Sequence, residues 1–400
     1  MNILYIHQYF KTPEEPGGTR SYWIAKQLIS HGHKVTMLTT SPHNHKRLER
    51  RVVDGIDVIY LRLPYDQRMS IFRRVIAFLK FMLMSTSVAW KERHVDVVIS
   101  TSTPLTVGFP ALILKWFKKI PYIFEVRDLW PEVPIQMGAL SNPVLQWIAR
   151  SFEKIIYRNA VHVITLSPGM QDGVTKYISE RKTSMIPNMA KIDKFWPRKK
   201  NWDYLKELDL SSNTFKVIHF GSLGVANGAE YIIDAAALLT NITDIEFLFV
   251  GGGSTESDLK QKTHDLNLTN VKFLGAFPMK QTSEIVNLCQ VSIVSFRDIP
   301  ILYTNSPNKL FDSLSAGLPI LVNSRGWTKD LVENLQCGFF VDPQSPQDLA
   351  DRVLFLYNNP ELAKEIGSKS RFLAETKYDK KILSEQFVRV VESSIITKLK

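Results

Sequence analysis

The feature that most constrains the fold is an alternation of short β-branched runs with longer helical patterns, which occurs twice along the chain. Such alternation is typical of βαβ units on a parallel sheet. In the first half, we expect strands at 2–7, 34–40, 95–101, 122–126 and 161–166, and helices at 19–30, 70–93, 142–158 and 168–178. In the second half, we expect strands at 216–220, 246–250, 271–274, 291–295 and 319–322, and helices at 229–239, 256–266, 282–289 and 307–316. The sequence therefore predicts an α/β protein with two open parallel sheets.

A polar segment from 187 to 214 separates the two alternating halves. It is rich in turn residues and holds a cluster of cations, as is typical of a domain junction. We expect a first domain over residues 1–195, a linker over 196–214 and a second domain over 215–378. Because ligands bind at the carboxyl ends of parallel strands, we expect the site in a cleft where the strand ends of the two domains face each other.

Composition and charge narrow the class of protein. The 400 residues include only two cysteines, Cys289 and Cys337, which favours a reducing compartment. The start, MNILYIHQYF, lacks the features of an export signal, and the longest apolar run is shorter than the ~20 residues of a membrane span. We therefore expect a cytoplasmic protein. The net charge is +15 for residues 1–200 and −4 for residues 201–400, so the first half fits a nucleic acid, an anionic membrane or an anionic substrate.

The stretch NSPNKLFDSLSAGLPI (305–320) reads as a helix that begins beside a cation. Pro307 suits the first helical position and Ser306 suits the cap, so the free amides there favour an anion. Lys309 adds a positive charge about one turn in. Asp312, a further turn in, is better placed to accept hydrogen bonds from hydroxyls such as those of a ribose. The alternative is an ordinary capped helix whose Lys309 and Asp312 lie in solvent.

Two glycine turns strengthen the interpretation of the second domain as a phosphate-binding domain. HFGSLGVANG (219–228) and FVGGGSTES (249–257) each follow an expected strand and precede an expected helix. Backbone of this kind can approach a phosphate closely, although glycine is also common in such turns for steric reasons alone. Neither turn has the spacing of the dinucleotide-binding fingerprint.

The first domain carries two stretches with candidate substrate contacts. A glycine-rich loop at 17–19 leads into a helix and is able to fold over a ligand. EVRDLWPE (125–132) follows an expected strand, where charged side chains face a ligand site or form an Arg–Asp pair that ties a loop.

The segment from 68 to 93 is apolar nearly all round in its middle and has cations at both ends. Such a helix is either buried or rests on a bilayer. LILKWFKKIPY (112–122) adds a second basic and aromatic patch, so we favour contact with an anionic membrane surface over a helix that only covers the sheet.

An acidic second half and the absence of a nucleic-acid module make nucleic acid an unsuitable partner. No Walker loop, nucleophile elbow or Asp-x-Asp pair occurs, so we expect no metal.

Over nearly its whole length, the chain resembles the retaining, nucleotide-sugar-dependent glycosyltransferases of family 4, which have the two-domain GT-B architecture. The resemblance is carried by PGGTRSYWIAKQLISHGHKVTMLTT, VITLSPGM, IPNMAKIDKFWP, HFGSLG, FVGGG, NVKFLGAFP and PNKLFDSLSAGLPI. EVRDLWPE together with SPNKLFD is similar to a branch that adds amino or deoxy sugars to bacterial surface polysaccharides. The resemblance also implies that the final helix, 379–400, packs back on the first domain.

The chain departs from the family pattern at the positions that bind the donor. Of the family's two acids separated by seven residues, Asp312 matches the second, whereas Thr304 stands at the first. Ser222 and Asn227 stand where family members commonly have the arginine and lysine that bind the diphosphate. Our hypothesis is that Lys309 supplies the missing charge. On the resemblance, we expect the donor site to include Gly221, Ser222, Asn227, Gly251, Gly252, Phe277, Thr304, Ser306, Asn308, Lys309, Leu310 and Asp312. We expect catalytic roles for Lys309, Arg127 and Asp128, and an acceptor side with Gly17, Gly18, Thr19, Glu125 and Trp130.

The resemblance implies a hexosyl transfer that needs neither a metal nor a cofactor. The donor is expected to be a nucleotide sugar, with uridine as the base. The acceptor is expected to be a polyprenyl-diphosphate-linked saccharide of an O-antigen or capsule, which places the protein peripherally on the inner face of the cell membrane. Two alternatives stay open, namely a GT-B-fold sugar-nucleotide epimerase and a non-catalytic partner subunit.

Overall fold

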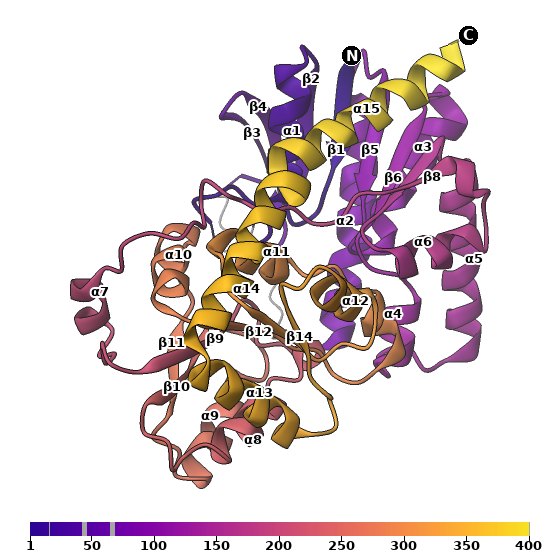
Figure 1. The fold of residues 1–400 in the computed structure, drawn as a ribbon. Coiled ribbons are helices and arrows are strands. Elements are labelled where there is room, and N and C mark those ends of the chain that lie inside the picture. The colour runs from indigo at the N-terminus through magenta and orange to yellow at the C-terminus, as the bar shows by residue number, and fades with distance from the viewer. Residues whose placement is uncertain (16, 42–45, 65–68, 400) are drawn as a thin grey trace. The chain divides into compact units, whose positions relative to one another are not determined.

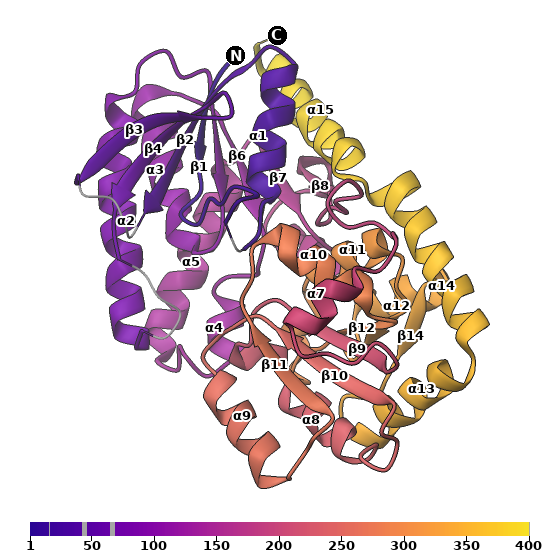
Figure 2. The same ribbon diagram turned by 90° about the vertical axis from the view of Figure 1, so that its left-hand side faces the viewer.

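The computed structural model describes residues 1–15, 17–41, 46–64 and 69–399. The chain forms two compact units, each with a parallel sheet and flanking helices (Figures 1 and 2). The first unit comprises residues 1–12, 18–187 and 381–400, and the second comprises 13–17 and 188–380. The predicted fold class, α/β with two Rossmann-like domains, is confirmed.

The first unit begins with a strand and alternates strands with helices. Its strands are β1 (Asn2–Ile6), β2 (Lys34–Ser41), β3 (Leu48–Val53), β4 (Ile56–Arg62), β5 (Val97–Thr101), β6 (Tyr122–Val126), β7 (His162–Thr165) and β8 (Thr183–Met185). Its helices are α1 (Arg20–Ser30), α2 (Ile71–Lys91), α3 (Gly108–Lys118), α4 (Glu132–Gln136), α5 (Pro143–Asn159), α6 (Pro168–Thr175) and the last, α15 (Lys380–Leu399), with short 3₁₀ turns η1 (Leu105–Val107) and η2 (Glu180–Lys182).

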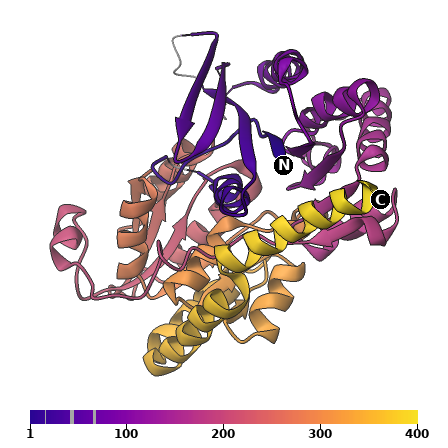
Figure 3. The ribbon, with the colours of Figure 1, turned by 90° about the horizontal axis from the view of Figure 1, so that it is seen from above.

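Among the described residues, the first sheet has the strand order β3-β4-β2-β1-β5-β6-β7-β8, and every pair except β3–β4 is parallel. The order reverses between β1 and β5, which is the kind of switch point where ligands bind in α/β sheets. Seen from above, α1 and α15 lie on one face of this sheet, and α2, α3 and α5 on the other (Figure 3). α15 is joined to α1 by Gln27 Nε2, which donates to Glu385 at 3.0 Å.

The antiparallel hairpin of β3 and β4 was not among the expected strands. Its turn is Asp54-Gly55, and both residues have positive φ, 50° and 86°. That dipeptide is the favoured sequence for a two-residue hairpin turn. The signal was therefore present in VVDGIDV, but the prediction followed only the βαβ pattern.

The second unit repeats the βαβ pattern with its own sheet. Its strands are β9 (Phe215–Phe220), β10 (Ile245–Val250), β11 (Val271–Gly275), β12 (Val291–Val294), β13 (Ile320–Val322) and β14 (Gly338–Phe340). Its helices are α7 (Trp202–Glu207), α8 (Glu230–Ala237), α9 (Glu256–Asp265), α10 (Met279–Leu288), α11 (Asn308–Ala316), α12 (Trp327–Asn334), α13 (Pro346–Asn358) and α14 (Pro360–Leu373), with 3₁₀ turns η3 (Val225–Asn227) and η4 (Pro300–Thr304) and a π-helical turn η5 (Ala374–Tyr378).

The second sheet has the order β11-β10-β9-β12-β13-β14 within the described residues, and its strands are parallel. Successive residues of a strand point to opposite faces. Phe247 of β10 accordingly joins one core, with α8 and α13, whereas Leu248 joins the other, with α10. The order reverses between β9 and β12, so the switch point of this unit lies at the carboxyl end of β9.

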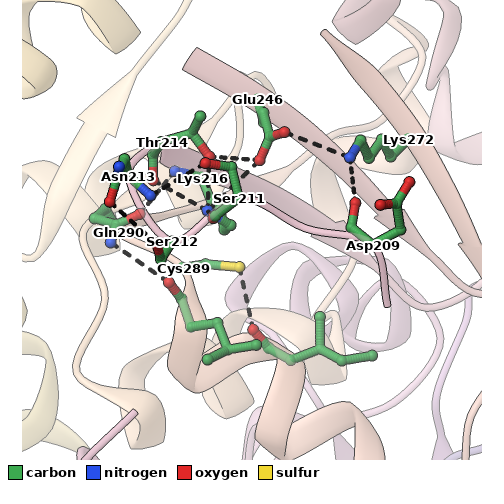
Figure 4. A network of polar contacts seen from close by, with 12 residues as sticks. Asp209, Ser211, Ser212, Asn213, Thr214, Lys216, Glu246, Lys272, Cys289 and Gln290 are labelled. Atoms are coloured by element: carbon green, nitrogen blue, oxygen red, sulfur yellow. Dashed lines mark hydrogen bonds and ion pairs between the residues drawn. The ribbon is translucent and has the colours of Figure 1, made fainter. Parts of the chain in front are cut away.

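At the opposite, amino-terminal end of this sheet, a polar network surrounds Lys216 (Figure 4). The ammonium of Lys216 is 3.5 Å from Glu246 and donates to Thr214 Oγ1 at 2.7 Å. Lys272 also approaches Glu246, at 3.6 Å. Both Lys216 and Glu246 are buried, and this pair lies at the opposite end of the strands from the glycine turns.

The main stretch of the second unit begins at residue 188, closer to the end of β8 than the sequence indicated. The predicted first domain ended at residue 195, whereas residues 188–195 contact the second unit. The reason is backbone pairing, since Ala190 N donates to Tyr378 O at 2.7 Å and Lys380 N donates to Ala190 O at 2.8 Å. The predicted linker, 196–214, also packs there, because Leu205 and Leu210 join a core of the second unit.

Candidate active site

The two glycine turns meet at the carboxyl ends of β9 and β10. Gly251 has a φ of 140°, and a Cβ at that position would lie 1.8 Å from the carbonyl oxygen of Gly221, so only glycine fits. Leu223 N donates to Gly252 O at 2.9 Å, which holds the turns together. Gly221 and Ser222 are exposed. The first turn therefore presents exposed backbone beside the switch point.

Lys309 lies against these turns. Its Nζ is 3.1 Å from Asn227 Oδ1 and 3.2 Å from His219 Nε2, and its Cε is 3.6 Å from the place where a Gly221 Cβ would be. The side chain is buried, and no carboxylate of the described residues forms an ion pair with it. Burial lowers the pKa of Lys309 to about 7. The alternative in which Lys309 is a solvated surface cation is therefore wrong.

His219, on β9, completes the surroundings of Lys309. Burial and the neighbouring ammonium hold the pKa of His219 well below its usual value, so the imidazole is neutral. The hydroxyl of Ser295, after β12, donates to Asn227 O at 2.7 Å and fixes the turn that carries the amide. The result is a buried amine whose hydrogen-bond partners among the described residues are neutral, so an anionic ligand would stabilise its charged form.

Asp312 is also buried, but it has a partner. Lys191 Nζ lies 2.6 Å from Asp312 Oδ1, and the two side chains are 6% and 10% exposed. Burial raises the pKa of Asp312, and Lys191 opposes that shift. The carboxylate of Asp312 and the ammonium of Lys309 thus stand about one helical turn apart on α11.

The predicted cap of α11 is wrong in detail. The helix begins at Asn308 rather than Pro307, and no side chain caps it. Ser306 instead accepts a hydrogen bond from Asn188 N at 3.2 Å, and its carbonyl accepts from Asn188 Nδ2. The serine therefore ties residue 188 to the second unit and is not free to cap the helix.

The remaining predicted donor residues differ in how accessible they are. Thr304 is partly exposed and donates to Ile301 O at 2.8 Å. Phe277 is partly buried and packs on a core cluster. The Leu310 side chain is fully buried, so only its backbone is left for a ligand, whereas Asn308 is partly exposed.

In the first unit, polar residues gather where β1, β5 and β6 end. Arg127 Nη1 donates to His7 Nε2 at 3.2 Å, and the backbone N–H of Arg127 donates to Ser102 Oγ at 3.0 Å. Burial and Arg127 lower the pKa of His7, so its ring is neutral and its Nδ1–H donates to Ser21 Oγ at 2.6 Å. Arg127 is thus fixed at the switch point of the first sheet.

Asp128 lies beside this cluster, and the pKa of its carboxyl group is raised. Its Oδ2 accepts from Thr103 Oγ1 at 2.7 Å, and burial raises its pKa despite the nearby Arg127. A carboxyl group whose pKa is raised holds and releases a proton closer to neutral pH, which suits general acid–base chemistry. The predicted pair of Arg127 and Asp128 is therefore present at the strand ends, but they do not form an ion pair with each other within the described residues.

Three predicted acceptor contacts have other roles. Glu125 is fully buried, where it accepts from Arg20 Nε at 2.8 Å, so its burial contradicts contact with an acceptor. Trp130 packs edge-on against Phe78 of α2, with ring centroids 6.0 Å apart. Thr19 is buried and accepts from Trp23 Nε1, whereas Gly17 is exposed and Gly18 is partly exposed.

Sequence reasoning missed four residues that hold the site together: His7, Arg20, Lys191 and His219. Each lies outside the motif that it supports, because its partner is far away along the chain. His7 and His219 follow the same pattern, since each lies at or near the end of a strand next to a switch point. That position is the one signal that was available.

Comparison with known proteins gives the family. Residues 17–189 match the glycosyl transferase 4-like domain, and residues 200–372 match the glycosyl transferases group 1 family. Similar proteins include the probable glycosyltransferase WbjE of Pseudomonas aeruginosa, 22% identical over 85% of each chain, and the putative colanic acid biosynthesis glycosyl transferase WcaI of Escherichia coli, 24% identical over 92% of each. Anabaena HepE, solved in complex with UDP-glucose, has the same fold, with a TM-score of 0.70 and 19% identity over 98% of this chain and 100% of that one.

The two Rossmann-like domains and these matches define a glycosyltransferase of the GT-B type. The chain belongs to the group 1 glycosyltransferases, with a glycosyl transferase 4-like domain in its first half. It is therefore a transferase enzyme.

The buried state of Lys309 predicts a particular pH dependence of stability. Its pKa is about 7 in the folded chain and about 10.4 in an unfolded one. The unfolded chain therefore binds more protons between these values, so this residue makes stability rise with pH, by up to about 1.4 kcal/mol per unit. In urea titrations, Lys309→Met is expected to be more stable than the wild type at pH 6 and to lose that advantage as the pH rises to 9.

The exposed Lys206 provides the control, because its side chain is 81% exposed and Lys206→Met should follow the wild type at every pH. Parallel stability curves for the wild type and Lys309→Met would contradict a buried, unpaired ammonium.

Proposed function

We propose that the chain is a retaining, metal-independent hexosyltransferase that moves a sugar from a nucleoside diphosphate, with uridine as the base, to a lipid-linked saccharide. The observation that carries this proposal is the buried ammonium of Lys309, which stands beside two open glycine turns and has no carboxylate partner in the described chain. A diphosphate is the anion that suits this place, because its oxygens can contact the ammonium while the exposed glycine turn at Gly221 and Ser222 lets it approach closely.

The hydrogen bond from Lys309 to Asn227 supports the charge replacement that the sequence indicated. Family members commonly carry a lysine at the position of Asn227. Here the ammonium of Lys309 reaches that same residue from α11, at 3.1 Å. Lys309 therefore brings a positive charge to the place where the side chain at 227 no longer supplies one.

The transfer proposed is a front-face displacement. The acceptor hydroxyl attacks the anomeric carbon on the side from which the diphosphate leaves. One carbon–oxygen bond forms, the other breaks, and the departing diphosphate oxygen takes the hydroxyl proton. Lys309 and the turn amides stabilise the charge that develops on the diphosphate. Asp128, hydrogen-bonded to Thr103, orients the acceptor hydroxyl, and Arg127 adds a second positive group.

The acceptor proposed is a saccharide on a polyprenyl diphosphate, in the synthesis of a bacterial surface polysaccharide such as an O-antigen (lipopolysaccharide) or a capsule. The name of the relative WcaI, which refers to colanic acid, supports a polysaccharide product. Relatives named for amino sugars, an α-D-kanosaminyltransferase and an α-N-acetylglucosaminyltransferase, are consistent with an amino or deoxy sugar donor.

A thermal-shift screen against UDP, GDP and ADP tests the donor site. A ligand at 100 times its dissociation constant stabilises the fold by about 2.7 kcal/mol, so one nucleotide should raise the melting temperature clearly. Lys309→Ala and Asp312→Ala should abolish the shift, and the exposed control Lys206→Ala should retain it. With the matching donor sugar, Lys309→Ala should lower turnover by a factor on the order of 10²–10³.

Three results of the screen and of the activity assays would contradict the proposal. If no nucleotide shifts the wild type, the chain is better explained as a non-catalytic partner subunit. If Lys309→Ala keeps turnover within a few-fold of the wild type, Lys309 does not stabilise the leaving diphosphate. Donor breakdown without any acceptor would instead favour the epimerase.

Membrane contact is proposed for the outer surface of α2, α3 and α5, which we name the outer helical face. Helix α2 buries Ala77, Phe78 and Phe81 against the rest of the unit and leaves its opposite side exposed. No helix of the described residues is long and apolar enough to cross a membrane. Of the large apolar side chains that are exposed in the described chain, more than half lie on these three helices: Phe72, Val75, Leu79, Leu83, Trp90, Trp116, Phe117, Val144, Leu145, Trp147, Ile148 and Ile155.

The charges on the outer helical face are almost all positive. The helices carry the cations Arg73, Arg74, Lys80, Lys91, Lys115, Lys118, Arg150, Lys154 and Arg158. Glu153 is the single acid in their ranges, and it is buried with its pKa raised to about 7. Exposed apolar groups among cations match the boundary of an anionic bilayer, where each cation contributes about 1 kcal/mol. We therefore place the protein at the inner face of the cell membrane, as a peripheral protein.

Flotation with vesicles tests this surface. The wild type should bind vesicles of phosphatidylcholine and phosphatidylglycerol and should bind pure phosphatidylcholine much less. Charge reversal at Arg73, Arg74 and Lys80 should lower binding more than 100-fold, because three attractive charges of about 1 kcal/mol each become repulsive.

The control is charge reversal at three exposed lysines of the second unit, Lys206, Lys280 and Lys364. That variant should bind as the wild type does. The membrane proposal would be wrong if the wild type ignored anionic vesicles or if both triple variants bound equally.

A further inference from the structure

Lys191 has no role in the function proposed so far, although it forms an ion pair with Asp312, a predicted donor residue. Its ammonium lies 2.6 Å from Asp312 Oδ1, inside the second unit, and both side chains are almost fully buried. Asp312 has no other charged partner among the described residues, and its Oδ1 is fully enclosed. The carboxylate therefore depends on one lysine for its charge balance.

The backbone around Lys191 is held firmly in the second unit. The preceding residue, Ala190, pairs with Tyr378 and Lys380 through two backbone hydrogen bonds, of 2.7 and 2.8 Å. Lys191 O accepts from the N–H groups of Lys194 and Phe195, each at 2.9 Å. A fixed backbone at both sides means that the ammonium approaches Asp312 from one defined direction.

The two carboxylate oxygens of Asp312 have different surroundings. Lys191 lies at Oδ1, and no ion pair to Oδ2 is found in the described part of the chain, so Oδ2 is the oxygen that we assign to a ligand. Without the lysine, burial alone would act on Asp312 and would favour its neutral form. A neutral carboxyl is a weaker acceptor than a carboxylate, because hydrogen bonds to charged groups are about twice as strong.

We propose that Lys191 is a positioning residue that holds Asp312 as a fixed, anionic acceptor for the ribose hydroxyls of the donor nucleotide. The inference rests on the proposed function, since it requires a ribonucleotide donor. It extends that function by giving the chain a means to distinguish a ribonucleotide from a deoxyribonucleotide. A pair that only ties residues 188–195 to α11 would affect stability but not this discrimination.

Calorimetric titration with UDP, GDP and ADP and with their 2′-deoxy counterparts tests the inference. The wild type is expected to bind one ribonucleotide more tightly than its deoxy form. Lys191→Met should lower this preference about tenfold, because a charge-assisted hydrogen bond is replaced by a neutral one. Lys191→Arg should restore part of the preference, and Asp312→Asn combined with Lys191→Met should lose no more than Asp312→Asn alone.

Lys216→Met is the matched control, because Lys216 is also buried beside a carboxylate in the same unit but at the other end of the sheet. It should reduce stability and leave the ribose preference unchanged. Lys191→Gln, which keeps a donor without the charge, gives the same comparison if the methionine variant folds poorly.

The outcomes separate the two proposals. If the wild type binds no nucleotide, the proposed donor site and this inference are both wrong. If the wild type prefers a ribonucleotide and Lys191→Met or Lys191→Gln keeps that preference, the transferase proposal stands and the role of Lys191 is wrong. Loss of the preference in Lys216→Met as well would also overturn the inference, because the effect would then follow from stability alone.

Discussion

A buried ammonium without a carboxylate partner constrains the second unit more than any other interaction. Burying a cation is costly unless an opposite charge accompanies it, and Lys309 has only the neutral Asn227 and His219 around it. The glycine turns add a second constraint, because the close contact between Gly221 and Gly251 leaves no room for a side chain at residue 251. An anion bound beside the glycine turns would supply the charge that the ammonium lacks, which is why we propose the donor site there.

The second unit has two buried lysine–carboxylate contacts among the described residues. Their positions along the strands suggest that one is structural and that the other lies near the proposed ligand site. Lys216 and Glu246 lie at the amino-terminal ends of the strands, where polar groups of the chain itself surround them (Figure 4). Lys191 and Asp312 lie by α11, which also carries Lys309 at its start. Because ligands bind at the carboxyl ends of parallel strands, we propose a role in ligand binding only for the second pair.

The sequence predicts the α/β class, the two parallel sheets and the placement of Lys309 beside the glycine turns, because these depend on local patterns and on the rule for strand ends. It does not predict the partners of Glu125 or Asp312, since Arg20 and Lys191 are more than 100 residues away from them in the chain. Local propensity also misled the prediction at Ser306. A serine before proline favours a helix cap, but here a backbone contact with Asn188 takes its hydroxyl.

The most direct test of the central claim is an experimental structure of the chain with UDP bound. The account predicts that the ammonium of Lys309 lies within hydrogen-bonding distance of a diphosphate oxygen, with the first glycine turn beside the same phosphate. A diphosphate bound away from Lys309, with that ammonium still held only by Asn227 and His219, would contradict it.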